Sequence, residues 1–202
     1  MSKAAPGVRY AECERETNET RISVVLDLDG GTRRDIGTGI PFFDHMLAQL
    51  AFHGRFDMGV SAEGDLEIED HHTVEDVGIV LGQAFAQALE GSDPIERYAS
   101  NHTAMDDALV LCALDISGRP GFYWEGEFRR ERLGTLSTEN VHEFFKSFAQ
   151  NAGFTLHIRK IAGQNDHHVV EATFKAVGRA IFSATRVIER RGSTSTKGKR
   201  GA

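Results

Sequence analysis

Three features are scarce or absent in this sequence of 202 residues, and each absence excludes a class of protein. The two cysteines, Cys13 and Cys112, form no CxxC spacing, which argues against a disulfide framework and favours reduced thiols in a cytoplasmic protein. Lysine and arginine number 23 against 30 acidic residues, and the net charge of −7 disfavours broad nucleic-acid binding. No apolar run approaches the length of a membrane span, and the polar start lacks the apolar stretch of a secretory signal.

A doubled string is the most informative feature of what the sequence does contain. DHHTVEDVGIVLGQAFAQAL begins at Asp70, and DHHVVEATFKAVGRAIFSAT begins at Asp166. Both strings read Asp-His-His-x-x-Glu, and both place a glycine seven residues after the glutamate, at Gly82 and Gly178. Agreement over the length of a whole helix predicts a duplicated structural unit.

Each copy has the pattern of an amphipathic helix, with Asp70 and Asp166 as good N-caps. A similar series of elements precedes each copy. In the first half, RISVVLDLDG predicts a strand, IPFFDHMLAQLAFHG a short helix, and RFDMGVSAEGDLEIED two short strands around Gly64. In the second half, DALVLCALDISGRPGFYWEGEF predicts a hairpin, STENVHEFFKSFAQNAG a helix and FTLHIRKIAGQND a strand.

This order of elements predicts an α+β fold of two tandem, pseudo-repeated halves, each a small sheet with helices packed on one face. We expect the first half, with a flexible N-terminus, to cover residues 1–93 and the second half to cover residues 94–190. The string GSDPI, at residues 91–95, is the natural joint between them. Residues 191–202 form a basic C-terminal tail.

The two helix starts predict metal ligands, because imidazole and carboxylate groups recur there at a fixed spacing. His71 and Glu75 are four residues apart and share one helix face, whereas His72 points about 100° away. His45 precedes the first histidine pair and Glu143 precedes the second, with a similar number of residues between. Pseudo-twofold pairing of the copies then predicts two ligand sets, one of His45, His72, His167 and Glu171, and the other of Glu143, His168, His71 and Glu75.

A single histidine pair at a helix start is usually a surface or capping feature, and its repetition together with the glutamate is what favours a metal site. Imidazole and carboxylate without thiolate suit Mn, Fe or Zn and disfavour a structural zinc site. His142 adjoins Glu143 and is interpreted as a neighbour of the ligand or a solvent-facing residue. His53, His102 and His157 are interpreted as ordinary polar residues.

The strings GIPFFDHMLAQLAFHG, DHHTVEDVG, LDISGRP, TLHI and NDHHVVEATFKAVGRA resemble the imidazoleglycerol-phosphate dehydratase family. The resemblance covers nearly the whole chain, from Arg9 to Lys197, with the motifs in the same order. It implies a hydro-lyase of histidine biosynthesis that converts imidazole glycerol phosphate to imidazole acetol phosphate, with two manganese ions per active site. The family's metal positions fall on His45, His71, His72, Glu75, His167, His168 and Glu171, and Glu143 stands where many relatives carry histidine.

The implied reaction explains why two metal ions and no redox cofactor would be needed. The hydrogen to be removed lies on a side-chain carbon near the imidazole, and no carbonyl group is available to stabilise a carbanion. Lewis acids on both ring nitrogens favour an imidazolate, which expels the neighbouring hydroxyl group and leaves a conjugated diazafulvene-like intermediate. Proton removal then gives an enol that becomes the ketone.

The resemblance also implies which carboxylates move protons. The family position falls on Glu19, just before the first strand, where the residue pattern alone indicates only a surface residue. Asp44 is expected to orient His45, and Asp106 is a further candidate carboxylate, although a turn residue is the simpler interpretation. The expected catalytic residues are Glu19, Glu171, His72 and Glu75.

The substrate phosphate needs cations, and the resemblance places several. Arginine's planar fork suits phosphate oxygens, and Arg97 and Arg119 match the family's phosphate-binding positions. Residues 191–202 resemble the family's Ser-Ser-Lys-Gly phosphate loop followed by a mobile tail, with Thr194 where many relatives have proline. The expected substrate-binding residues are Glu19, Arg97, Arg119, Lys175, Ser195, Thr196 and Lys197.

The resemblance finally implies active sites between subunits, in a hollow homo-oligomer of twenty-four chains built from trimers, with metal binding coupled to assembly. Two other functions stay open at this point. A dinuclear metal hydrolase would use the same ligands and cations but would release inorganic phosphate. A non-catalytic metal-binding or shell-forming protein would have its metals closed off by protein ligands.

Overall fold

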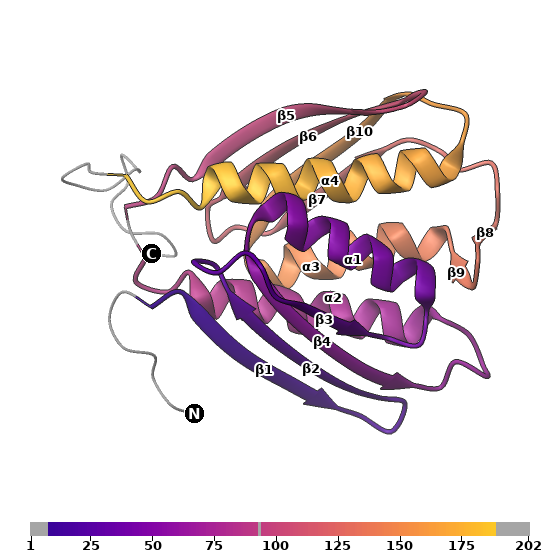
Figure 1. The fold of residues 1–202 in the computed structure, drawn as a ribbon, viewed down its shortest axis with the longest axis horizontal. Coiled ribbons are helices and arrows are strands. Elements are labelled where there is room, and N and C mark those ends of the chain that lie inside the picture. The colour runs from indigo at the N-terminus through magenta and orange to yellow at the C-terminus, as the bar shows by residue number, and fades with distance from the viewer. Residues whose placement is uncertain (1–7, 93, 189–202) are drawn as a thin grey trace.

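The computed structural model of the chain describes residues 8–92 and 94–188. Two four-stranded sheets form the outer layers, and the four helices of the described residues lie between them (Figure 1). Each sheet therefore has one face against the helices and the other face outward. This arrangement confirms the predicted α+β fold with helices packed on one face of each sheet. Within the described ranges, no helix combines the length and apolar character needed to cross a membrane.

Both halves follow the same order of elements, which confirms the repeat. The first half contains β1 (Tyr10–Glu16), β2 (Thr20–Asp27), β3 (Arg34–Gly37), α1 (Pro41–Gly54), β4 (Asp57–Gly64) and α2 (His71–Ala88). The second half contains β5 (Tyr98–Met105), β6 (Ala108–Ile116), β7 (Gly121–Glu125), α3 (Glu139–Ala152), β10 (Phe154–Ala162) and α4 (Asp166–Ala184), with the small hairpin β8 (Arg132–Leu133) and β9 (Leu136–Ser137) inserted before α3. The strand orders β1-β2-β4-β3 and β5-β6-β10-β7 match position by position.

The central strands form because apolar residues alternate along them. On β2, Ile22, Val24 and Leu26 are fully buried, while the residues between them face outward. β6 repeats the pattern, with Val110 and Cys112 buried among alternating residues. A strand with one apolar face buries that face against the helices, so the sequence pattern fixes which side of each sheet carries the core.

Two strand predictions were wrong. β6 and β7 do not form a hairpin, because β10 lies between them: β10 pairs antiparallel with β6 and parallel with β7. The segment around Gly64 is not two strands but one, and β4 ends at that glycine. A Cβ atom on Gly64 would lie 2.0 Å from the Thr73 hydroxyl oxygen, so the strand end runs directly against α2.

Neither aspartate caps its helix through its side chain as predicted: Asp70 occupies the N-cap position of α2 without a side-chain cap bond, and Asp166 is the first residue of α4. Asp70 accepts hydrogen bonds from the backbone N–H and the hydroxyl of Ser137, at 2.6 and 2.7 Å. Asp166 accepts from the backbone N–H groups of residues 129 and 130, both at 2.8 Å, and Asn165 caps α4 instead. The segment that leads from β7 to α3 is therefore fastened to the starts of both α2 and α4.

Helices of one half pack against helices of the other half: α2 contacts α3, and α1 contacts α4. The repeated glycines lie at these crossings. A Cβ atom on Gly82 would lie 2.6 Å from the carbonyl oxygen of Phe148, and one on Gly178 would lie 2.5 Å from the carbonyl oxygen of Leu50. The glycines thus allow the helix backbones to approach closely, which explains the spacing seen in the sequence.

We expect Gly178→Ala to lower the free energy of unfolding by about 1–3 kcal/mol, because the added methyl group forces α1 and α4 apart. Urea-induced unfolding followed by circular dichroism measures the change. Gly37→Ala is the matched control, since a Cβ atom there meets nothing within 4 Å. Equal loss of stability in the two variants would contradict the close-approach explanation.

Candidate metal centre and active site

All four helices begin at the same end of the molecule, where β8 and β9 also lie (right side of Figure 1). His71 and His72 open α2, and His167 and His168 follow the first residue of α4. α1 and α3 each place a candidate ligand at the fifth position, His45 and Glu143. The repeat therefore gathers all eight predicted metal ligands at one end of the helix layer.

The first cluster joins the starts of α1 and α4. Nε2 of His167 lies 3.2 Å from Oε2 of Glu171, and Nε2 of His45 lies 3.9 Å from the same oxygen. The other carboxylate oxygen of Glu171 accepts from Nζ of Lys175 at 2.8 Å. Burial works to raise the pKa of Glu171, but the hydrogen bond and charge of Lys175 outweigh it and hold that pKa below its usual value. Glu171 is therefore an ionised carboxylate that faces two imidazoles.

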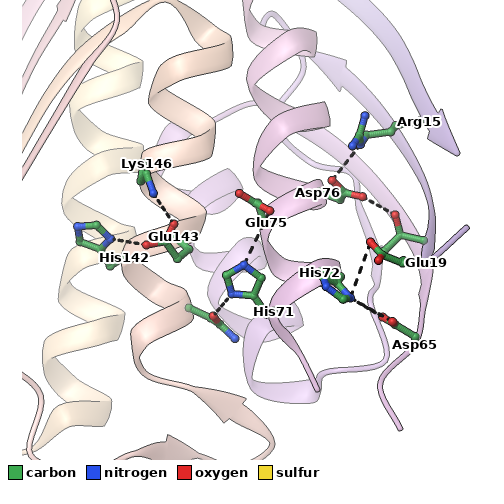
Figure 2. Close-up of polar contacts among 12 residues, drawn as sticks. Arg15, Glu19, Asp65, His71, His72, Glu75, Asp76, His142, Glu143 and Lys146 are labelled. Atoms are coloured by element: carbon green, nitrogen blue, oxygen red, sulfur yellow. Dashed lines mark hydrogen bonds and ion pairs between the residues drawn. The ribbon is translucent and has the colours of Figure 1, made fainter. Parts of the chain in front are cut away.

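The second cluster joins the starts of α2 and α3 (Figure 2). Nε2 of His71 lies 3.8 Å from Oε2 of Glu75, one turn along α2. Glu143, on α3, accepts from Nζ of Lys146 at 2.8 Å, and this hydrogen bond lowers its pKa. His142 lies beside it, with Nδ1 3.1 Å from Oε1 of Glu143. An ionised Glu143 is thus available as a carboxylate ligand, although Nζ of Lys146 donates a hydrogen bond to one of its oxygens.

The second histidine of each pair lies apart from these clusters. His72 contacts Asp65 through Nδ1 at 3.0 Å, and the same nitrogen lies 3.9 Å from Oε2 of Glu19 (Figure 2). His168 contacts Asp107 through Nδ1 at 2.7 Å, and its Nε2 lies 3.4 Å from Asp106. Within one chain, each predicted four-residue set is therefore divided: three of its residues lie in one cluster, and the fourth, His72 or His168, lies apart. Across residues 8–92 and 94–188, no three His, Cys, Asp or Glu side chains converge closely enough to hold a metal ion.

Three imidazoles are nevertheless oriented as metal ligands usually are. Nδ1 of His71 lies 3.1 Å from the side-chain oxygen of Asn140, and Asp65 and Asp107 hold Nδ1 of His72 and His168. Such contacts fix Nδ1 as the protonated nitrogen and leave the Nε2 lone pair for a metal. The donors are imidazole and carboxylate without thiol, because Cys112 is buried in the core and Cys13 contacts Gln87 at the other end of α2. The residues present therefore fit a divalent transition metal.

Sequence reasoning missed these three orienting residues. Asp65 directly follows the end of β4, Asp107 lies in the β5–β6 turn, and Asn140 is the second residue of α3. No fixed spacing links them to the histidines, and only the position of each at an element end indicates a polar role. The predicted orienting role of Asp44 was wrong: its carboxylate accepts from the backbone N–H and hydroxyl of Thr38, so it secures the loop before α1.

The predicted phosphate ligands lie in two places. Lys175 lies with the metal ligands through its contact to Glu171. Arg97 and Arg119 lie at the opposite end of the second sheet, where Arg97 is buried and makes a bidentate pair with Asp115 at 2.7 and 3.1 Å. Arg119 is exposed. Ser195, Thr196 and Lys197 lie outside the described residues.

The two ends of α4 show how far apart these places are. The backbone N–H of Arg97 donates to the carbonyl oxygen of Ala184 at 2.8 Å, at the last residue of the helix. Glu171 lies thirteen residues earlier on the same helix, which corresponds to about 20 Å. One chain therefore presents its candidate metal ligands and its candidate phosphate-binding arginines at opposite ends.

Comparison with known proteins gives one consistent family. The family model described as imidazoleglycerol-phosphate dehydratase matches residues 38–181. The proteins of that name from Acetivibrio thermocellus and Thermoanaerobacter pseudethanolicus are each 53% identical, over 94% and 95% of this chain and 98% and 99% of their own lengths.

Solved structures agree. The imidazoleglycerol-phosphate dehydratase of Staphylococcus aureus superposes with a TM-score of 0.79 at 36% identity, covering 88% of this chain and 99% of that one. The Pyrococcus furiosus enzyme in complex with (S)-C348 gives 0.80 at 36% identity, covering 92% and 98%. Sequence, fold and the doubled helix starts therefore agree that this chain belongs to the imidazoleglycerol-phosphate dehydratase family.

Proposed function

We propose that the chain is a hydro-lyase of histidine biosynthesis that converts imidazole glycerol phosphate to imidazole acetol phosphate and water. The names of its relatives supply the substrate and the loss of water, and the family resemblance supplies the product. One observation of the structure supports it most directly: three of the repeated histidines have Nδ1 held by side-chain oxygens, which leaves the Nε2 lone pair available to a metal. A reaction on an imidazole ring that lacks a neighbouring carbonyl group needs such electrophiles.

We further propose two manganese ions per active site. The ligands would be the predicted sets, with His45, His167 and Glu171 joined by His72, and His71, Glu75 and Glu143 joined by His168. Bound manganese would act as a Lewis acid that withdraws charge from the imidazole ring of the substrate. Before metal arrives, Lys175 and Lys146 keep the carboxylates of Glu171 and Glu143 ionised.

Proton transfer falls to Glu19 in this proposal. Overall the substrate loses one water molecule. A hydroxyl group leaves one carbon and a proton leaves the next, and the resulting enol becomes the ketone when a proton is added to carbon and the enol O–H proton is lost. Oε2 of Glu19 lies 3.9 Å from the His72 ring, and the side chain is half exposed. This position supports Glu19 as the group that would accept the proton from carbon beside the predicted ligands and return a proton during ketone formation.

The active site is shared between chains in this proposal. About 20 Å of α4 separate Glu171 from the segment that holds Arg97, and the glycerol chain between ring and phosphate in the substrate is far shorter. The position of His72 and His168 apart from the other members of their predicted sets points the same way. The homo-oligomer of twenty-four chains implied by the resemblance would bring the metal end of one subunit to the arginine end of another.

The product of the reaction tests this proposal. Purified protein is stripped with EDTA, reloaded with Mn²⁺ and given imidazole glycerol phosphate. We expect a ketone product that retains its phosphate, formed only after Mn²⁺ is returned. Release of inorganic phosphate would instead identify a phosphate-ester hydrolase, and no turnover with metal bound would identify a non-catalytic metal protein.

Metal binding should release protons in a pH-dependent way. The hydrogen bond to Asp65 raises the pKa of His72, so a fraction of this imidazole is protonated near neutral pH in the metal-free protein. A metal needs the unprotonated Nε2, so protons released per Mn²⁺ should increase as pH falls from about 8 to about 6. Calorimetry in buffers of different ionisation enthalpy measures this number. A pH-independent proton count would contradict His72 as a ligand.

A further inference from the structure

One buried carboxylate ties the turn between β1 and β2 to helix α2. Asp76 follows the predicted ligand Glu75 on α2 and is 6% exposed. Its Oδ1 accepts from Nε of Arg15 at 2.9 Å, and its Oδ2 accepts from the hydroxyl of Thr20 (Figure 2). Arg15 lies near the end of β1 and Thr20 begins β2, so Asp76 contacts the chain on both sides of the turn.

The turn itself is held by Thr17. Its hydroxyl accepts from the backbone N–H groups of Glu19 and Thr20, at 3.1 and 3.0 Å. Its own backbone N–H donates to the carbonyl oxygen of Thr20 at 2.9 Å. The backbone of Glu19 is therefore fixed within the turn, and the turn is fixed to α2 through Thr20 and Asp76.

The side chain of Glu19, in contrast, is left available. Its carboxylate makes no hydrogen bond to any residue of the described ranges, and its contact with His72 is at 3.9 Å. The side chain is 55% exposed. A group that must accept and return a proton needs a fixed position together with an unoccupied carboxylate, and this arrangement provides both.

The second half shows the alternative. The residue equivalent to Asp76 is Ala172, so α4 offers no carboxylate to the β5–β6 turn. There Asp107 of the turn makes the contacts itself, accepting from the backbone N–H groups of Gln164 and Asn165 at 2.6 and 3.1 Å and contacting Nδ1 of His168. In the second half, these contacts occupy the carboxylate of Asp107. In the first half, Asp76 on α2 anchors the turn instead.

We infer that Asp76 is a positioning residue for catalysis: it anchors the β1–β2 turn to α2 and thereby holds the carboxylate of Glu19 beside His72. The inference rests on the proposed role of Glu19 in proton transfer. It assigns a function to a buried carboxylate that neither the predicted metal sets nor the predicted phosphate ligands use.

A double-mutant cycle in the metal-loaded assembly tests the inference. Asp76→Ala should lower kcat by about 10- to 100-fold with KM and manganese content nearly unchanged, because Glu19 loses its fixed position. In a Glu19→Gln background the same change should have almost no further effect on kcat. Asp76→Asn, which keeps one acceptor oxygen and the shape, should retain more activity than Asp76→Ala. Equal losses in both backgrounds would overturn the inference.

Hydrogen exchange provides a readout that does not need activity. The backbone amides of residues 15–21 should exchange faster in Asp76→Ala than in the unaltered protein. Asp57→Ala is the matched control: Asp57 accepts from the backbone N–H groups of residues 31, 32 and 33 and so anchors a different loop. Unchanged exchange at residues 15–21 would also overturn the inference. Faster exchange in a protein without dehydratase activity would keep the anchoring and reject the proposed function.

Discussion

Replacement of Glu19 by glutamine is expected to lower kcat by about 10²- to 10⁴-fold while leaving manganese content and assembly unchanged. Glutamine has the shape of glutamate but cannot take up a proton at this position. Glu19 belongs to neither predicted ligand set, and its carboxylate makes no hydrogen bond within the described residues. The loss should therefore fall on turnover rather than on metal binding or folding. Steady-state kinetics together with metal analysis of the same preparation measures both.

Glu16→Gln is the matched control for this variant. Glu16 ends β1 close to the same turn, and its exposed carboxylate pairs with Arg21 at 2.7 Å, away from His72. We expect its kcat to stay within about twofold of the unaltered protein, as for most exposed residues outside an active site. A Glu19→Gln variant as active as Glu16→Gln would remove Glu19 from the mechanism. Loss of manganese from Glu19→Gln would show that it supports the metal instead.

Two inactive variants should restore each other's activity when they share one assembly. His167→Ala removes a predicted metal ligand, and Arg119→Glu reverses the charge of an exposed predicted phosphate ligand at the other end of the chain. A site built from two chains can combine the intact metal end of one with the intact arginine end of the other. Random mixing at equal amounts should then give about a quarter of the unaltered activity.

Co-expression with two different affinity tags, followed by tandem purification, yields the mixed assemblies needed for this measurement. Each variant alone is expected to fall to about 1% of the unaltered activity or below, because charge-assisted phosphate contacts and metal ligands both stabilise the bound state. A chain that carries both substitutions, mixed with unaltered chains, provides the control. It should give about a quarter of the activity for shared sites and about half for self-contained sites. Mixed single variants that stay inactive would rule out sharing between chains.

The helices of the site could be predicted well from the sequence, and the reason is their periodicity. The doubled string predicted α2 and α4. His45 and Glu143 precede the two histidine pairs by similar distances, and this predicted that they hold equivalent positions on α1 and α3. Helix ligands lie at fixed steps along one element, so spacing alone predicts which of them share a face. Glu19 was found only through resemblance, because a turn residue has no periodic pattern.

Strand partners could not be predicted in the same way. The run GFYWE has the composition of a strand, and the residues Gly118 and Pro120 before it look like a hairpin turn. The actual partner of β7 is β10, which comes after α3 in the chain. Pairing of this kind depends on how the two sheets and the helix layer close together, which a local pattern does not contain.

The contacts that orient the histidines were hidden for a related reason. Asn140 reaches His71 from another helix, and Asp107 reaches His168 from a turn 61 residues away in the chain. Asp44 lies next to His45 in the sequence, yet it binds Thr38 instead. Neighbours in the sequence point to different sides of a helix, so adjacency to a ligand does not by itself identify its partner, although His142 does contact Glu143.

The crossing of α1 with α4 and of α2 with α3 has a consequence for each half taken alone. Each helix of the described residues packs against a helix of the other half as well as against its own sheet, so a single half would leave part of its helix surface uncovered. A single half would leave the helix surfaces at these crossings exposed, and a symmetric pair of identical halves would cover them. By the same reasoning, a chain cut at the joint near residue 92 should yield two fragments that fold only when they are mixed, because the helices of each fragment cover those of the other.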